Sequence, residues 1–198
     1  MNNLKELTDE QLAMSYIEGN NRAFDELLSR TQSKLYSYIM FVVHDRETAD
    51  DVFQETFVKV ITKLHQKQYV PSGKFGAWLM RIAHNVMMDL YRNNKSDKVV
   101  DAANNNDLSN FANNGLLDAS IESQFVNTQV MRDVQKMMNN LPAPQREVVY
   151  MRFYQEMSFK EIAETTGVSI NTSLGRMRYA ILNLRRMAKE HDIQLQLA

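Results

Sequence analysis

Four polar residues recur along one face of a helix that the sequence predicts after residue 74. Arg81, Asn85, Asp89 and Arg92 stand at i, i+4, i+8 and i+11, opposite the apolar face that would enter the core. An asparagine amide can pair with a base edge through a donor and an acceptor together, and an arginine can hold a phosphate or a guanine. This face is therefore the best candidate in the first half of the chain for contacts with DNA.

A long basic helix predicted from about residue 169 offers a second candidate surface. Ser158 with Glu161 has the spacing of a capping box, which predicts a short helix, and Gly167 predicts a turn before the long one. Two helices across such a turn indicate a helix-turn-helix motif, whose second helix presents its N-terminal residues to the major groove. The candidate contacts are Ser169, Asn171, Thr172, Ser173, Arg176 and Arg178. A basic solvated helix is the alternative, and for Arg185 and Arg186 it is equally good.

Asp51, Gln54 and Glu55 form a third cluster, on a helix that Asp45 would cap. At i, i+3 and i+4 they share an outer face, while the inner face of the same helix is apolar. Residue pattern alone favours a solvated face for this stripe, so its spacing predicts no particular partner.

The elements that carry these residues are predicted to be helices. Apolar residues recur at helical spacing over residues 24–42, 49–64 and 78–90, after a small first helix that Thr8 and Gln11 would cap. A loop at residues 66–74 separates the last two of these helices. We therefore expect residues 1–94 to form one helical domain.

Helical periodicity stops between residue 93 and about residue 120, where asparagine is frequent. Such a polar segment cannot bury enough apolar area to offset its ordering entropy, so we expect a flexible linker at residues 95–122. The amphipathic pattern resumes at residues 126–141, ends at Pro142 and starts again at Pro144. Residues 123–198 are expected to form a second helical domain.

The composition favours an all-α protein, because the 198 residues include only three prolines and six glycines. The absence of cysteine excludes disulfides, thiolate nucleophiles and cysteine metal sites. No apolar run approaches the length of a membrane span, and the N-terminus lacks a signal-peptide pattern. We therefore expect a cytoplasmic protein.

The net charge of −1 hides an uneven distribution along the chain. Residues 61–95 contain six basic residues and one acidic, and residues 123–198 contain ten basic and seven acidic, whereas residues 1–60 and 96–122 are acidic. Local basic patches, rather than the total charge, attract a phosphate backbone. The near-neutral total therefore does not argue against DNA binding.

Several short motifs follow one another in a specific order. In the first domain they are residues 23–27 (AFDEL), 49–57 (ADDVFQETF) and 75–85 (FGAWLMRIAHN). In the second they are residues 141–142 (LP), 145–148 (QREV), 158–164 (SFKEIAE), 167–169 (GVS) and 171–172 (NT). Their order and spacing resemble the bacterial sigma-70 family, specifically the extracytoplasmic-function (ECF) members, which keep only the second and fourth conserved regions joined by a linker.

The resemblance implies a protein that binds RNA polymerase core, recognises a promoter and helps to melt it, with no catalytic residue, metal or cofactor of its own. By this resemblance Asp51, Gln54 and Glu55 bind the coiled coil of the β′ clamp. The β flap and promoter DNA are further implied partners, and an anti-sigma factor is another. Stable membrane insertion is not expected.

The resemblance also assigns roles to the two DNA-facing surfaces. Asn85 falls where family members meet an extruded base of the −10 element, and Tyr69 in the loop at 66–74 would stack on that base. The helix-turn-helix would read the −35 element. Leu174 and Gly175 depart from the basic residue and serine that are more usual in the family, which leaves open the bases that are read.

Two other functions fit parts of the sequence. A helix-turn-helix regulator acting alone as a dimer would explain residues 123–198, but not the polar stripe or the Arg81 face. A metal-dependent phosphohydrolase could use His44, Asp45, Asp50, Asp51 and Glu55. Their spacing does not favour it, because His44 ends a helix, Asp45 is a natural cap and the other histidines have no companion at ligand spacing.

Overall fold

The computed structural model describes residues 4–96 and 136–190, and every regular element in these two ranges is a helix. The all-α fold class predicted from the composition is confirmed. The chain divides into two compact units, residues 1–103 and 104–198. Nearly all of the predicted linker, residues 95–122, lies outside the described residues, as does the first part of the helix predicted at 126–141.

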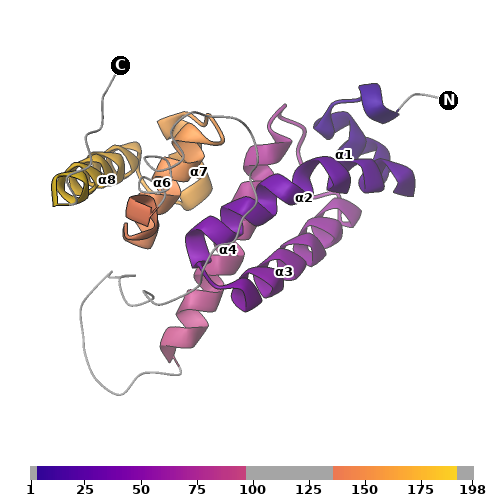
Figure 1. Cartoon of the computed structure of the whole chain (residues 1–198). Helices are drawn as coiled ribbons and strands as arrows, with labels where there is room; N and C mark the ends of the chain where they lie inside the picture. Colours follow the sequence, from indigo (N-terminus) through magenta and orange to yellow (C-terminus); the bar gives the residue numbers. More distant parts are fainter. Residues whose placement is uncertain (1–3, 97–135, 191–198) are drawn as a thin grey trace, which may run out of the picture. The chain divides into compact units, whose positions relative to one another are not determined.

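The first unit contains η1 (Leu4–Glu6), α1 (Asp9–Ile17), α2 (Asn21–Val43), α3 (Arg46–His65) and α4 (Phe75–Ser96). The long helices α2, α3 and α4 pack against one another, and α1 contacts all three (Figure 1). Leu12, Leu27, Ile39, Val52 and Met87 are fully buried between them. Because each such side chain stabilises the fold by about 1.5–3 kcal/mol, this shared core holds the outer faces of α3 and α4 at a fixed spacing.

Two helices of this unit begin at the caps that the sequence predicts. The Thr8 hydroxyl accepts a hydrogen bond from the Gln11 N–H (3.2 Å), and the Gln11 side chain accepts one from the Thr8 N–H (2.9 Å). Asp45 accepts a hydrogen bond from the Thr48 N–H at 2.8 Å and begins α3. Hydrogen bonds from the Thr48 side chain and backbone hold the pKa of the Asp45 carboxyl below its usual value. Both caps satisfy N–H groups that the first turn leaves unpaired.

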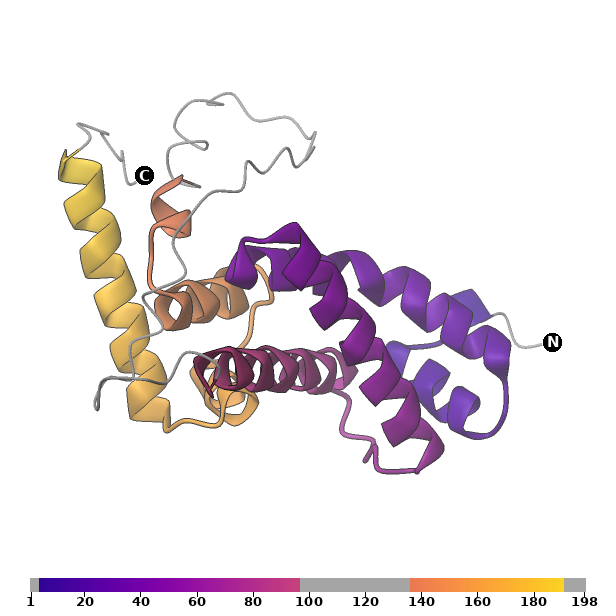
Figure 2. The ribbon, with the colours of Figure 1, turned by 90° about the horizontal axis from the view of Figure 1, so that it is seen from below.

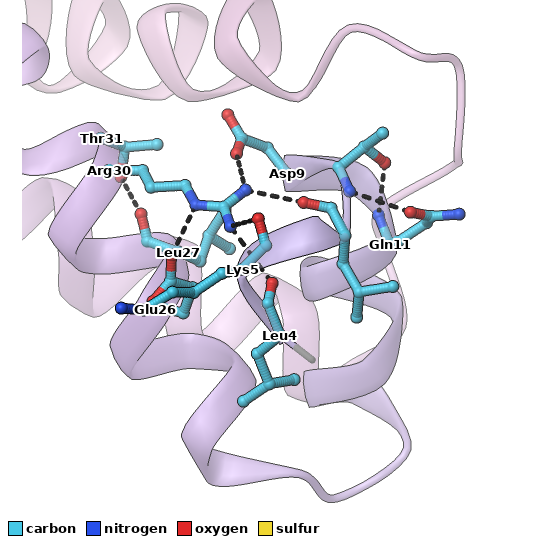
Figure 3. A network of polar contacts seen from close by, with 10 residues as sticks. Leu4, Lys5, Asp9, Gln11, Glu26, Leu27, Arg30 and Thr31 are labelled. Atoms are coloured by element: carbon cyan, nitrogen blue, oxygen red, sulfur yellow. Dashed lines mark hydrogen bonds and ion pairs between the residues drawn. The ribbon is translucent and has the colours of Figure 1, made fainter. Parts of the chain in front are cut away.

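Arg30 ties the start of the chain to α2 (Figure 3). Its guanidinium donates hydrogen bonds to the carbonyl oxygens of Leu4 (3.1 Å), Lys5 (2.9 Å) and Leu7 (2.7 Å). It also pairs with Glu26, one turn earlier on α2, at 2.8 Å. The planar guanidinium fork satisfies several carbonyls at once. This network fixes η1 and the beginning of α1 against α2.

The second unit is built from α6 (Ala143–Phe153), α7 (Phe159–Thr166) and α8 (Ile170–Glu190), after a helical turn at residues 136–139. Both α6 and α7 pack on α8, the long yellow helix of Figure 2. Met151, Ile162 and Ala180 are buried in their common core. Within α6, the buried Arg146 donates hydrogen bonds to the carbonyl oxygens of Asn139 (2.8 Å) and Leu141 (3.2 Å), which fastens the preceding turn.

Candidate nucleic-acid interface

The predicted polar face of α4 is exposed along its length. Arg81, Asn85 and Arg92 are all exposed, and the side chain of Arg92 keeps 75% of its accessible surface. Ile82 and Val86 on the opposite face are each 5% exposed. The four-residue spacing thus separates a core face from a polar face, as the sequence predicts.

Asp89, the acidic member of this row, is engaged by two cations. Its carboxylate lies 3.2 Å from the Arg92 guanidinium and 3.7 Å from the Lys59 ammonium of α3. An acid facing DNA would repel phosphates unless its charge were compensated. Asp89 therefore acts first as the counter-ion that holds Lys59 and Arg92 together.

The stripe on α3 is also exposed, at Asp51, Gln54 and Glu55. One turn further on, Val58 is 57% exposed and extends the stripe with an apolar side chain. Lys59 lies 3.5 Å from Glu55 as well as beside Asp89, so it stands between the α3 stripe and the α4 face. Lys59 is not among the residues that the sequence predicts for either surface. Its position four residues after Glu55 indicates the first of these pairs, but not the second.

Tyr69, in the loop between α3 and α4, does not face outward. Its ring is 5% exposed and packs against Phe75 (centroids 5.6 Å apart) and Trp78 (4.8 Å). Its hydroxyl donates a hydrogen bond to Glu10 at 2.9 Å, and burial, followed by this bond, raises the pKa of Tyr69. In this structure the buried ring presents no face on which the base predicted to stack on Tyr69 could lie. The loop brings its ring back onto the start of α4, and the hydroxyl reaches Glu10, 59 residues earlier, a contact that local sequence does not reveal.

The helix-turn-helix has the local geometry that the sequence predicts. Ser158 and Glu161 form a complete capping box at the start of α7, and Gly167 ends that helix with a φ of 66°, a conformation that favours glycine. Ser169 then caps α8 by accepting a hydrogen bond from the Thr172 N–H at 3.0 Å. The two hydroxyls of Ser169 and Thr172 also lie 2.8 Å apart.

Ser173, a predicted DNA contact, is 1% exposed, and its hydroxyl has no hydrogen-bond partner among the described residues. It lies on the side of α8 that packs into the unit, together with Met177 and Ala180. In this structure the hydroxyl predicted to contact DNA is therefore not accessible. A small residue here lets the neighbouring helix approach closely. Ser173 is predicted together with the polar capping residues beside it, but it lies on a different side of the helix.

The two predicted arginines of α8 face different directions. At about 100° per residue, Arg176 and Arg178 are about 200° apart around the helix. Arg178 is exposed and shares a face with Asn171, seven residues earlier, whereas Arg176 is half-buried toward the packed side. The exposed face also carries Leu174 (44% exposed) and Leu182 (47% exposed). One outward surface of α8 therefore combines polar Asn171, apolar Leu174 and cationic Arg178.

Among residues 4–96 and 136–190, no three His, Asp or Glu side chains lie together so that they could hold a metal ion. Within the same ranges, no helix is long and apolar enough to cross a membrane.

Family models match both units. The model of Sigma-70 region 2 matches residues 27–96, and that of Sigma-70, region 4 matches residues 131–173. The RNA polymerase sigma factor CnrH of Cupriavidus metallidurans is 30% identical over 170 residues, which cover 85% of this chain and 88% of that protein. The chain belongs to the sigma-70 family.

This sigma factor is also similar to members of the ECF group. The ECF RNA polymerase sigma factor SigW of Bacillus subtilis is 25% identical over 178 residues, 87% of this chain and 92% of that protein. The solved structure of CnrH in complex with the cytosolic domain of CnrY covers 92% of this chain and 97% of that chain, with a TM-score of 0.61 and 26% identity. The predicted ECF membership and the predicted function in directing transcription initiation are confirmed.

The region 4 match ends at Ser173. Leu174 and Gly175, which differ from the more usual family pattern, follow immediately. The helix α8 therefore continues beyond the matched segment, to Glu190.

Proposed function

We propose that this sigma factor binds RNA polymerase core through the α3 stripe, captures the −10 element on the α4 face and reads the −35 element with α8. In this assignment residues 1–94 are the region 2 domain, residues 95–122 the linker and residues 123–198 the region 4 domain. The protein acts in the cytoplasm by binding alone and catalyses no reaction itself.

The observation that carries this proposal is the exposure of two different surfaces on consecutive helices. The α3 stripe presents Asp51, Gln54 and Glu55, which suits a basic protein surface, and the α4 face presents Arg81, Asn85 and Arg92, which suits bases and phosphates. One small domain can therefore contact the polymerase and the promoter at the same time.

Promoter melting follows from binding energy. Asn85 would hold one base out of the stack by hydrogen bonds, and Arg81 and Arg92 would hold the phosphates beside it. The free energy of these contacts offsets the few kcal/mol that unstacking the base costs. No nucleotide hydrolysis is then required. In the second unit, Asn171 and Arg178 would meet the −35 duplex, and joining the two contacts in one chain raises the affinity of both.

An anti-sigma factor is part of the proposal as a partner. The solved structure of CnrH contains the cytosolic domain of CnrY. A partner of this kind would compete with polymerase or promoter for the same exposed faces.

Transcription from purified RNA polymerase core tests the proposed function. Core supplied with this sigma factor should start transcription at discrete sites on genomic templates, whereas core alone should not. Mapping the start sites would then identify the −10 and −35 sequences. Equal transcription with and without the protein would contradict the proposal, and binding to operators without core would favour a stand-alone regulator.

A further inference from the structure

The loop between α3 and α4 has few backbone contacts of its own. At its start the Lys67 N–H donates to the Leu64 carbonyl (3.0 Å) and the Gln68 N–H to the Lys63 carbonyl (2.9 Å). In the part of the chain that the structure describes, residues 69–73 form no hydrogen bond between backbone groups. Such a segment keeps one conformation only if side chains satisfy and hold it.

Glu10 of α1 supplies that support from outside the loop. Hydrogen bonds from the Gly73 backbone amide, and then from the Tyr69 hydroxyl and the Ser72 amide, lower the pKa of the Glu10 carboxyl against the opposing effect of desolvation. The bond from Tyr69 measures 2.9 Å. Gly73 has a φ of 72°, and a Cβ added at this glycine would lie 3.6 Å from one Glu10 carboxylate oxygen. The Glu10 carboxylate thus lies against the loop at both ends of the segment 69–73, at the Tyr69 hydroxyl and near Gly73.

The aromatic cluster fixes the other side of Tyr69. Because the ring lies against Phe75 and Trp78 and the hydroxyl against Glu10, Tyr69 is held inward from two directions. The next residue, Val70, is 75% exposed. With Tyr69 turned inward, Val70 becomes the apolar side chain that the loop presents to its surroundings.

We propose that Glu10 is a positioning residue for promoter capture, and that it holds loop 66–74 in the shape that presents Val70 to the −10 strand. This inference rests on the proposed function, which places that loop at the −10 element. Hydrogen bonds to a carboxylate are stronger than those between neutral groups. A loop held in advance does not pay its ordering entropy at each binding event, so the anchor increases affinity without touching DNA.

Hydrogen exchange tests the anchor directly. The variants are Glu10→Ala and Glu10→Gln, with Glu18→Gln as the matched control, because Glu18 is an exposed acid at the end of the same helix. In the full-length protein, exchange at the amides of the loop at residues 69–73 should become about tenfold faster or more in Glu10→Ala, because the loop loses the contact with Glu10 that holds it. The control should exchange like the wild type.

Strand binding by the holoenzyme tests the functional role. The probe is a fluorescent single-stranded oligonucleotide carrying the −10 segment of a mapped promoter. Glu10→Ala should bind it about tenfold more weakly, because a tenfold loss corresponds to one or two charge-assisted hydrogen bonds. Binding to core should stay unchanged. Val70→Ser should weaken binding in the wild-type background and add little to Glu10→Ala, because both changes act on one loop conformation.

Three results would contradict either the role of Glu10 or the proposed function. Unchanged exchange in Glu10→Ala, or strand binding equal to that of Glu18→Gln, would overturn the role of Glu10. If Glu10→Ala fails to fold, Tyr69→Phe removes one of the same bonds and keeps the aromatic ring, and unaltered exchange and strand binding in that variant would count equally against the anchor. A wild-type holoenzyme that does not bind the strand would instead refute the proposed function, while the exchange measurement still decides whether Glu10 holds the loop.

Discussion

The exposed faces of α4 and α8 hold their charges in different ways. On α4, Asp89 lies between Lys59 (3.7 Å) and Arg92 (3.2 Å), so these cations are placed before any ligand arrives. On α8, Arg178 is exposed and forms no ion pair with any described residue. We call this fixing of cations by ion pairs bracing. Braced side chains suit a single strand whose bases must be bound at fixed positions, whereas an arginine without an ion pair can adjust to the backbone of a duplex. The two faces should therefore respond differently to mutation.

The largest loss of binding is expected from a change at Glu55, the residue of the α3 stripe that pairs with Lys59. Glu55→Lys places a cation beside Lys59 and reverses the charge offered to the polymerase, so affinity for core should fall about a hundredfold. Fluorescence titration of labelled protein with core measures this, and Glu18→Lys, at the exposed residue that follows α1, is the control. An unchanged affinity, with a normal circular dichroism spectrum, would exclude the α3 stripe as the core-binding surface.

The next effect separates the two arginines of α8. Arg178→Ala should weaken binding of a −35 duplex by about 1–3 kcal/mol, because it removes a cation from the face that Asn171 shares. Arg176→Ala should cost clearly less, since Arg176 is half-buried about 200° away around the helix. Gel-shift titration with holoenzyme compares the two. A larger loss at Arg176 would place the DNA on the other side of α8.

A smaller effect tests the bracing itself. Asp89→Asn removes a negative charge from the α4 face and releases Lys59 and Arg92, so binding to single strands of any sequence should rise severalfold and depend more steeply on salt. Discrimination between the −10 sequence and a scrambled strand should fall. If Asp89 instead contacted a base, this variant would lose affinity for the −10 strand alone.

The smallest effect concerns the buried side of α8. Ser173→Ala should leave −35 binding unchanged and raise stability by up to about 1 kcal/mol, because the buried hydroxyl has no partner in the described part of the chain. Thermal unfolding and the same duplex titration measure both quantities. Ser158→Ala gives the opposite sign for comparison: losing its cap should lower stability by about 1 kcal/mol. Reduced −35 binding by Ser173→Ala would show that this hydroxyl reaches DNA after all.

Local sequence was enough to predict the helices and their outward faces. Thr8, Asp45 and Ser158 cap their helices as expected, because a cap depends on residues within one turn. The rows at Asp51, Gln54 and Glu55 and at Arg81, Asn85 and Arg92 are exposed together, because spacing along a helix determines which side chains share a face. The family resemblance was readable for the same reason, since its motifs lie within single helices or short turns.

Only the tertiary structure decided which of these residues are free to act. Asp89 meets Lys59 across two helices, Tyr69 turns inward to meet Glu10 from the first helix, and Ser173 is buried on the packed side of α8. Each of these outcomes depends on a contact between segments that are distant in sequence. Periodicity predicts that a side chain leaves a helix on a given side, but what it meets there depends on how the helices pack. The sequence therefore determined the surfaces of this sigma factor, and the packing determined how their charges and loops are held.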